Sequence, residues 1–487
     1  MTQKTPPEQA PFSQEEWAQT PPAVQAFVWD LVAHVQQLEN ELSTLHERTN
    51  RSSRNSSKPP SSDGPEVARK PRKQSDPKRK PGGQVGHKGT QRKLVAVESV
   101  KACYDLKPEV CHCCGHLLSE CSATEGQDRE PYRHQVTEIP PVVAQVTEYR
   151  LHTWSCPECG SETRAELPAG VPQGAFGPRL QATVALLSGR YHLSKRDTAA
   201  VLDDLFQVEV GDGSVCTLEQ RTSEAVSAPV EQARAYVQEQ SVVHMDETGW
   251  RENNQKAWLW VVATCLVTVF LIRASRGGQV AREMLGESFK GILNSDRWSA
   301  YNWVAVDSRQ LCWAHLLRDF QAFVERGGES QRIGEAILSQ SELMFEWWHR
   351  VRDGTMTRAV LQEKMTSVQQ EVGNLLRQGA ACAHDNTAGT CRDILKREAA
   401  LWTFVRVEGP EPTNNLAERQ IRPGVLWRKS SFGTQSQAGS QFAERIMTVV
   451  ATLKQQQRNV LDYLVDACDA ANWKRPAPSL LPRLPTP

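Results

Sequence analysis

The sequence lacks an apolar run long enough to cross a membrane as a helix. Its longest such stretch, residues 257–272, has sixteen residues, whereas a spanning helix needs about 20. The stretch is rich in β-branched and aromatic residues and lies between Lys256 and Arg273. It therefore predicts two paired strands, at about 257–264 and 267–274, and we expect no membrane partner.

Two further features are missing. Met1 is followed by polar and proline-rich sequence instead of an apolar leader, so we expect a cytoplasmic and not a secreted protein. The glycine-rich stretch 81–89 lacks the Gly-Lys-Ser/Thr ending of a phosphate-binding loop. Nucleotide binding is therefore not predicted.

Net charge is also absent, because 57 basic residues balance 57 acidic ones. The distribution is uneven, however, since basic residues dominate 69–93 and Asp76 is the one acid among them. Such a block repels itself and stays open until an anion neutralises it. DNA phosphate contacts are predicted for Arg69, Lys70, Arg72, Lys73, Lys78, Arg79 and Lys80.

Cysteine is plentiful, and four of the 13 cysteines form two C-x-x-C knuckles, each followed by glycine. The glycine lets the backbone turn so that two thiolates face one ion, and four thiolates make a closed tetrahedral site. Without a leader, this spacing favours metal over disulfides. A structural Zn²⁺ is therefore predicted, with ligands Cys111, Cys114, Cys156 and Cys159.

Alternatives remain at the knuckles. Cys113 could replace a neighbouring ligand, while Cys103 and Cys121 are expected to be bystanders. Redox-active pairs are the other interpretation, but no thioredoxin-like strand–helix context surrounds them. The strand-like stretch 145–151 between the knuckles is typical of a zinc ribbon.

Near the N-terminus, apolar residues alternate at spacings of three and four, which is the a/d seam of a coiled coil. The seam consists of Val24, Val28, Leu31, Val35, Leu38, Leu42 and Leu45. We favour a homo-oligomer, although an amphipathic helix docked on its own domain has the same pattern. The helix should end near Thr49, before the serine- and proline-rich linker 50–65.

Helical periodicity returns at 178–234. A turn at 211–213 precedes Ser214, a suitable N-cap for a helix through Arg221. Short helices around a turn are typical of a helix-turn-helix domain that recognises DNA. A helical packing module without DNA contact has the same pattern, so both interpretations stay open.

Strands and helices alternate from residue 242 onward. Five strands are predicted, at 242–246, 258–264, 267–272, 292–296 and 309–313. Helices are predicted near 278–285, through much of 315–404, around Glu418 and at 442–454, and the tail from Pro476 is expected to be loose.

Three acids in this interval suggest catalysis. Asp246 and Asp296 each end a predicted strand, and Glu418 lies on a short helix that Pro423 should end. If they converge, they would hold two divalent cations, which is the chemistry of cutting and joining nucleic-acid backbones. Mg²⁺ (or Mn²⁺) is expected, because hard cations prefer carboxylate oxygens. Glu247 should point to the opposite sheet face, which makes it a poor ligand.

On the Glu418 helix, Asn415 and Arg422 should share the face of the acid, since they lie three residues before and four after it. We predict that Asn415, Arg419 and Arg422 contact DNA while Glu418 binds metal. Singly, each acid also fits a cap, a turn or a surface ion pair. The joint order of strand, strand and helix is what favours catalysis.

Two aromatic features have two interpretations each. His315 either assists at the active site or packs behind Trp313, and packing is favoured. Trp347 and Trp348 either stack on bases or pack in a core, and again packing is favoured.

Several motifs are characteristic in combination. Beside the seam, the knuckles and the stretches 55–63 and 83–87, they are Asp246-Glu247-Thr248-Gly249, Asp296-Arg297-Trp298-Ser299-Ala300-Tyr301, Cys312-Trp313-Ala314-His315-Leu316 and Asn414-Asn415-Leu416-Ala417-Glu418-Arg419. Together they resemble transposases of the insertion-sequence sixty-six type, in the Asp-Asp-Glu transposase class, over nearly the whole chain.

The resemblance implies a multidomain α+β protein with a ribonuclease H-like α/β catalytic core that carries a helical insertion. It also implies Asp246, Asp296 and Glu418 as the metal-binding triad. The expected domains are a coiled-coil helix (1–50), a basic linker (51–98), a zinc ribbon (99–168), a helical DNA-binding module (169–236), the catalytic domain (237–460, insertion about 320–405) and a C-terminal helix with a tail (461–487).

The implied function is transposition. An oligomer would bind terminal inverted repeats in double-stranded DNA, hydrolyse phosphodiesters and join the freed 3′ hydroxyls to target DNA. The protein would be nucleoid-associated, and companion proteins of the same element are implied partners. Two alternatives are a zinc-ribbon DNA-binding regulator and a ribonuclease H-like nuclease without strand joining.

Overall fold

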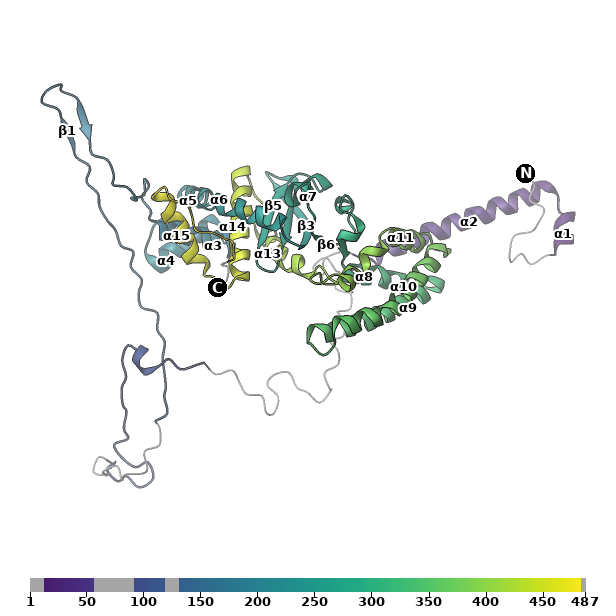
Figure 1. Ribbon diagram of the computed structural model, residues 1–487, viewed down its shortest axis with the longest axis horizontal. Coiled ribbons are helices and arrows are strands. Elements are labelled where there is room, and N and C mark those ends of the chain that lie inside the picture. Colours follow the sequence, from purple (N-terminus) through teal and green to yellow (C-terminus); the bar gives the residue numbers. More distant parts are fainter. Residues whose placement is uncertain (1–12, 57–91, 119–130, 483–487) are drawn as a thin grey trace. The chain divides into compact units, whose positions relative to one another are not determined.

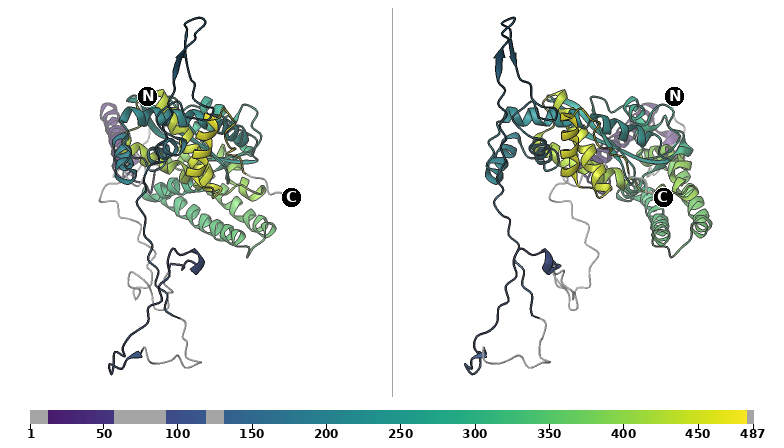
Figure 2. Two further views of the ribbon diagram at one scale, coloured as in Figure 1. Left: turned by 90° about the vertical axis from the view of Figure 1, so that its left-hand side faces the viewer. Right: turned by 60° about the vertical axis from the view of Figure 1, so that its left-hand side comes forward.

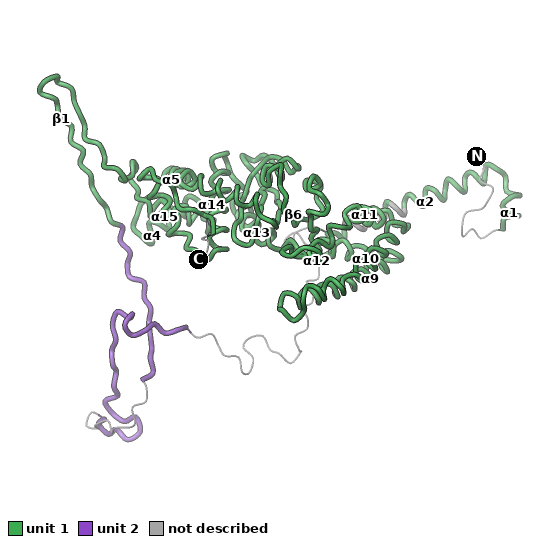
Figure 3. The backbone as a smooth tube through the Cα atoms, in the orientation of Figure 1, with its two compact units in different colours: residues 1–67, 145–487 green, residues 68–144 purple. Residues whose placement is uncertain are grey.

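The computed structural model describes residues 13–56, 92–118 and 131–482 (Figure 1). The chain divides into two units, residues 1–67 with 145–487, and residues 68–144 (Figure 3). The seven basic residues predicted to contact DNA between 69 and 80, and also Cys121, lie outside the described residues. The protein is a mixed α+β molecule with helices and two sheets.

The N-terminal segment forms the predicted long helix. α1 (Gln14–Gln19) starts with a capping box between Ser13 and Glu16. α2 (Pro22–Thr49) begins at a proline, a favoured first residue of a helix, and ends at the predicted position. Six of its seven seam residues are exposed, with Leu31 at 54% and Leu38 at 52%, and Val28 is half-buried. The helix is thus confirmed, while oligomerisation through it stays a prediction.

The described part of residues 68–144 contains little regular structure. η2 (Val97–Ser99) is one 3₁₀ turn. The backbone of Val95 exchanges two hydrogen bonds of 2.8 Å with the side chain of Gln135. A β-bridge between Val110 and Leu117 closes the first cysteine knuckle.

The second knuckle lies in a hairpin of β1 (Thr153–Ser155) and β2 (Glu162–Arg164). The prediction of a strand at 145–151 is wrong, because the hydrogen-bonded pairing of β1 with β2 begins only at Thr153. Val146 is 93% exposed, so its apolar side chain gains no burial in this stretch.

A five-stranded sheet forms the centre of the larger unit. Its strands are β3 (Val242–Glu252), β4 (Gln255–Ala263), β5 (Thr268–Arg273), β6 (Ile292–Ser295) and β7 (Arg309–Leu311). Their order is β5-β4-β3-β6-β7, with antiparallel pairing from β5 to β3 and parallel pairing from β3 to β7.

All five strands were predicted, but the end of β3 was not. β3 continues six residues past Asp246 and pairs with β4 around Asn253 and Asn254, whose φ angles of 48° and 60° suit a tight hairpin turn. The apolar stretch 257–272 is a strand pair, as predicted. No helix within the described ranges is long and apolar enough to span a bilayer.

The two faces of the sheet are covered by different helices. On one face Met245 and Trp260 pack with α6 (Ser227–Gln238), α7 (Gly278–Leu285) and α15 (Val460–Asn472). On the other face Leu259 and Val261 pack against α13 (Asn415–Ser431) and α14 (Gln437–Gln455). Side chains alternate along β3, so Asp246, paired with Val261, shares the face covered by α13.

Between β7 and α13 lies a helical insertion with its own hydrophobic core. It comprises α8 (Trp313–Glu325), α9 (Gly328–Arg352), α10 (Arg358–Ala381), α11 (Asp385–Leu395), η6 (Glu398–Leu401) and α12 (Thr403–Arg406), with α9 and α10 side by side (Figure 2). Trp348 is 8% exposed in this core and Trp347 packs against it, which confirms packing as their role. The short turns η4 (Ser299–Tyr301) and η5 (Val306–Ser308) connect β6 to β7.

The helices of 169–236 do not form a separate body. α3 (Pro178–Gly189), α5 (Asp212–Ala225) and α6 contact α14, α15 and the sheet, and Ala182 and Val230 belong to the same core as β3. The more peripheral α4 (Lys195–Phe206) packs on α3 and α5. The packing interpretation therefore accounts for these helices, and DNA reading by them stays a prediction.

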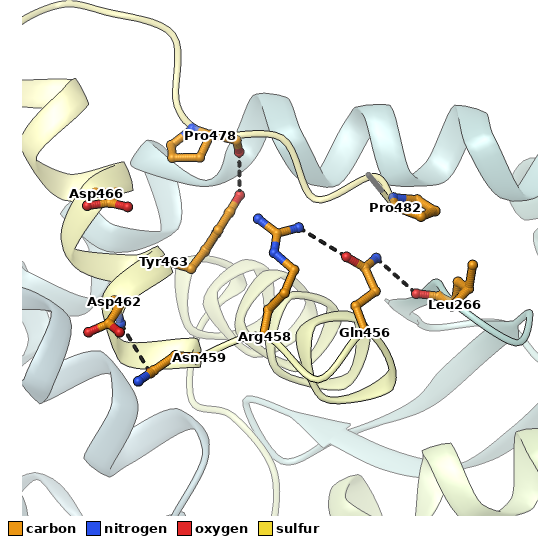
Figure 4. A pocket seen from close by; sticks show the side chains of 9 residues that line it. All are labelled: Leu266, Gln456, Arg458, Asn459, Asp462, Tyr463, Asp466, Pro478 and Pro482. Carbon is orange, nitrogen blue, oxygen red and sulfur yellow. Dashed lines mark hydrogen bonds between the residues drawn. The ribbon is translucent and has the colours of Figure 1, made fainter. Parts of the chain in front are cut away.

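The described part of the tail is packed and not loose. Leu480 is fully buried, and the hydroxyl of Tyr463 donates to the carbonyl of Pro478 at 2.7 Å. Tail residues Pro478 and Pro482 line a pocket of about 500 Å³ with Arg458 and Tyr463 (Figure 4). The expectation of a loose tail is thus wrong up to residue 482, because these apolar side chains cover α15.

Candidate active site

The two aspartates lie at the same level on neighbouring strands. In the parallel ladder of β3 and β6, His244 is opposite Asn294, so Asp246 and Asp296 each follow a paired residue by two positions. Asp296 comes directly after β6 ends at Ser295. Its carboxylate accepts the backbone N–H of Trp298 at 2.8 Å, and that of Asp246 accepts the N–H of Glu247 at 2.9 Å. The register thus brings the first two predicted ligands together.

Glu418 reaches this face from the first turn of α13. The residue before the helix, Asn414, is 1% exposed and joins the helix to β3. Its side-chain amide donates to the Met245 carbonyl at 2.6 Å, and its oxygen lies 3.2 Å from Nδ1 of His244. Asn294 adds bonds of 2.7 and 3.2 Å to the carbonyls of Glu411 and Thr413. These buried bonds set the start of α13 beside Asp246.

The carboxylates repel one another. Burial, followed by repulsion from Glu247, Asp296 and Glu418, raises the pKa of Asp246 well above its usual range. One oxygen of Glu418 is buried without a hydrogen-bond partner among the described residues. Crowded, partly buried carboxylates, one of them with an unpaired oxygen, fit a divalent cation, which would reverse this electrostatic penalty.

Glu247 lies on the opposite face, as predicted. Its carboxylate accepts Nε of Arg276 at 2.9 Å and the hydroxyl of Tyr301. Burial and the charge of Asp296 raise the pKa of Glu247 above its ordinary value. A carboxylate with two such partners is not available as a metal ligand.

His315 does not pack behind Trp313. Nδ1 of His315 lies 3.6 Å from Oε1 of Glu418, while the indole of Trp313 donates to the Leu401 carbonyl at 2.9 Å in the core of the insertion. α8 turns the two neighbours to different sides, so the packing interpretation was wrong. Burial, and then the charge of Arg318, lowers the pKa of His315, so its imidazole is neutral near pH 7.

The helix that bears Glu418 is longer than predicted. α13 runs to Ser431 with Pro423 inside it, although an internal proline costs about 3 kcal/mol. Ile421 and Gly424 pack in the core against β4 and α14, and this burial on both sides of the proline keeps the chain helical. Asn415, Arg419 and Arg422, predicted to contact DNA, are exposed on α13.

Arg297 connects Asp296 to the helical insertion. Its guanidinium lies 2.6 Å from Asp319 of α8 and 2.7 Å from Asp393 of α11. Arg397 also pairs with Asp393, at 2.5 Å. The residue next to a candidate metal ligand is therefore held by two helices of the insertion.

Each cysteine knuckle forms the same turn. The N–H of Cys111 donates to the His116 carbonyl at 2.8 Å, and that of Cys156 to the Ser161 carbonyl at 2.9 Å. Gly115 and Gly160 have positive φ, 73° and 71°, which glycine adopts readily. Hydrogen bonds from backbone N–H groups lower the pKa of Cys111, and those from Ser161 lower the pKa of Cys159. These hydrogen bonds favour the thiolate form of Cys111 and Cys159, which is the form that binds metal.

Comparison with known proteins identifies the family. The family model described as "Transposase IS66 family" matches residues 173–442, which is more than half of the chain. The chain belongs to this family. Residues 4–93 of the transposase also match a family of unknown function, DUF6444.

Two relatives come from Sinorhizobium fredii (strain NBRC 101917 / NGR234). The uncharacterized protein y4qI is 30% identical over 232 residues, which cover 43% of this chain and 42% of y4qI. The uncharacterized protein y4hP is 24% identical over 401 residues, 74% of this chain and 70% of y4hP. The match to y4qI thus spans less than half of that protein's length.

Sequence reasoning missed several residues of this site. Asn414, Cys312 and Arg276 act through partners far away in the chain, so no local spacing marks them. The one available signal for Asn414 and Cys312 was their presence inside the characteristic motifs, and no such signal marks Arg276.

Proposed function

We propose that this transposase binds the terminal inverted repeats of its element, cuts DNA and joins the freed 3′ hydroxyls to a target. The proposal rests most directly on the placement of Asp246 and Asp296 on neighbouring strands, with Glu418 from α13 on the same face. The strand order β5-β4-β3-β6-β7, with three antiparallel and then two parallel strands, supports a ribonuclease H-like core.

Asp246, Asp296 and Glu418 would hold Mg²⁺ (or Mn²⁺), since they offer the hard oxygen ligands these ions prefer. A pair of such ions, when bound, lowers the pKa of the attacking water and stabilises the leaving oxygen. The chain itself fixes the carboxylates: the register of β3 and β6 sets the aspartates, and Asn414 sets the helix of Glu418. Glu247 and Arg276 neutralise each other behind the sheet.

DNA would be held outside this centre. Asn415, Arg419 and Arg422 are exposed on α13 next to Glu418, and the basic block from Arg69 to Lys80 would add phosphate contacts. We further propose a structural Zn²⁺ on Cys111, Cys114, Cys156 and Cys159, a homo-oligomer formed through α2, and a cytoplasmic, nucleoid-associated protein that acts with companion proteins of its element.

The decisive experiment replaces Asp246 with Asn, which keeps the shape but removes the charge. Loss of groups that only support a metal ligand costs 10–100-fold, so loss of a ligand should slow Mg²⁺-dependent cleavage of terminal-repeat DNA at least about 100-fold. Binding of the same DNA, measured by mobility shift, should persist. Undiminished cleavage by Asp246→Asn would refute the proposed centre.

The same assay separates the alternatives. A DNA-binding regulator would show no cleavage with any metal, and Asp246→Asn would leave its DNA binding unchanged. A nuclease without strand joining would cut the ends but fail to join pre-cut ends that carry a free 3′ hydroxyl. A transposase joins those ends to target DNA.

A further inference from the structure

Beside the carboxylates lies a second group of potential ligands with different chemistry. Cys312, His315 and Glu418 each offer one ligand atom, and all three atoms lie within 4.8 Å of one another. Nδ1 of His315 and Oε1 of Glu418 are 3.6 Å apart, and both are buried atoms without a hydrogen-bond partner among the described residues. Orphaned buried donors and acceptors are costly, so this arrangement needs an explanation.

The geometry comes from two helix N-termini. Cys312 is the N-cap of α8 and His315 lies three residues later, so both face the same side. Glu418 comes from the first turn of α13. The sulfur of Cys312 accepts the N–H of Asn414 at 3.1 Å. Burial raises the pKa of the free Cys312 thiol, so the bound cation itself would have to displace this proton.

We propose that Cys312, His315 and Glu418 form a binding site for a soft divalent cation of the Zn²⁺ type, which shares Glu418 with the magnesium centre. Thiolate sulfur and imidazole nitrogen select zinc, whereas magnesium prefers oxygen. With ligand bonds of about 2.0 to 2.3 Å, tetrahedral ligands lie roughly 3.3 to 3.7 Å apart. The 3.6 Å between His315 and Glu418 already fits this spacing.

Charge balance is favourable at this site. Binding releases the Cys312 proton to solvent, so that one thiolate and one carboxylate neutralise the two charges of the ion. The positive charge of Arg318, whose guanidinium lies 4.0 Å from Glu418, repels a bound cation. The negative charges of Asp296 and Asp319 act on His315 and favour a cation there. Three protein ligands leave a fourth position for water, as in exchangeable zinc sites.

Sharing Glu418 makes the two metals competitors. A carboxylate drawn toward His315 and Cys312 is withdrawn from Asp246 and Asp296, so zinc should inhibit magnesium-dependent cleavage. This inhibitory role rests on the proposed function, whereas metal binding by the three residues does not.

The binding test uses Co²⁺ as a spectroscopic probe on the full-length protein, purified with zinc in its cysteine knuckles. Co²⁺ should produce a thiolate-to-cobalt charge-transfer band that Cys312→Ser loses. His315→Gln, at a partly exposed position, should weaken Co²⁺ binding at least about 10-fold. Cys391→Ser, a buried thiol in the insertion core, should keep the band.

Identical cobalt spectra for the wild type and Cys312→Ser would overturn the site. If Cys312→Ser does not fold, unchanged Co²⁺ affinity in His315→Gln would overturn it equally. These outcomes do not depend on DNA cleavage, so they distinguish failure of this site from failure of the proposed function.

The inhibition test measures cleavage in Mg²⁺ with added Zn²⁺, each variant being normalised to its own zinc-free rate. Half-inhibition of His315→Gln should require at least about 10-fold more zinc than the wild type. Equal zinc sensitivity would exclude competition for Glu418 even if cobalt binds.

Discussion

At the scale of single residues, the site depends on buried polar side chains that hold other residues in place. Asn414 makes three hydrogen bonds to β3 and Cys312 without facing solvent. α13 starts at the next residue, so a displacement of Asn414 also displaces Glu418 in the first turn of the helix.

We therefore predict that Asn414→Asp impairs the active site. A carboxylate in place of the amide faces the Met245 carbonyl without a donor, which costs about 1–3 kcal/mol and shifts α13. Mg²⁺-dependent cleavage should fall, and a higher Mg²⁺ concentration should be needed for half-maximal rate. The matched control is Asn374→Asp, exposed on α10; equal metal dependence of the two variants would contradict a positioning role for Asn414.

A second residue-scale prediction concerns Glu444, whose carboxylate accepts the Ile272 N–H at 2.6 Å. Burial raises the pKa of Glu444 from 4.5 to about 7. The folded protein therefore binds this proton more tightly than the unfolded chain, and its contribution to stability is lost as pH rises from 4.5 through 7.

The loss amounts to about 3 kcal/mol. Glu444→Gln stays neutral and can still accept the Ile272 N–H, so it should flatten this part of the pH–stability curve. Urea unfolding at several pH values measures the effect. A slope unchanged by the substitution would show that Glu444 titrates normally.

At the scale of elements, α13 is longer than its local sequence predicts. Pro423 predicted a helix end, but packing around Ile421 and Gly424 keeps the helix intact. Pro423 is exposed, so Pro423→Ala should restore a backbone N–H without opening the core. Urea unfolding should then show a gain of roughly 1–3 kcal/mol; a loss of stability would mean that the proline bends α13 into its working shape.

Local patterns predicted elements better than their limits. The five strands were found because their apolar residues are confined to short runs. The end of β3 was missed because Thr248 and Gly249 after Asp246 look like a turn, yet residues 248–252 pair fully with β4. The two aspartates were found because each one ends a short, mainly apolar run that was predicted as a strand. The proximity of His315 to Glu418 could not be foreseen, since it depends on how the insertion and α13 pack together.

At the scale of the whole molecule, the exposed seam of α2 should control assembly. Leu31→Lys with Leu38→Lys places charges in the apolar seam, so light scattering should show a smaller particle than the wild type. Ala33→Lys, a seam-free position on the same helix, is the control. If both proteins have the same mass, α2 does not mediate association.

The pairing of Arg297 with Asp319 and Asp393 has an evolutionary consequence. A family member with a different insertion would need acidic residues at the positions of Asp319 and Asp393, or would need to replace Arg297. Otherwise a positive charge would be stranded next to Asp296, where it would weaken the hold of that aspartate on any cation. Chimeras that exchange only the helices between β7 and α13 should therefore take Arg297, Asp319 and Asp393 from the same parent protein.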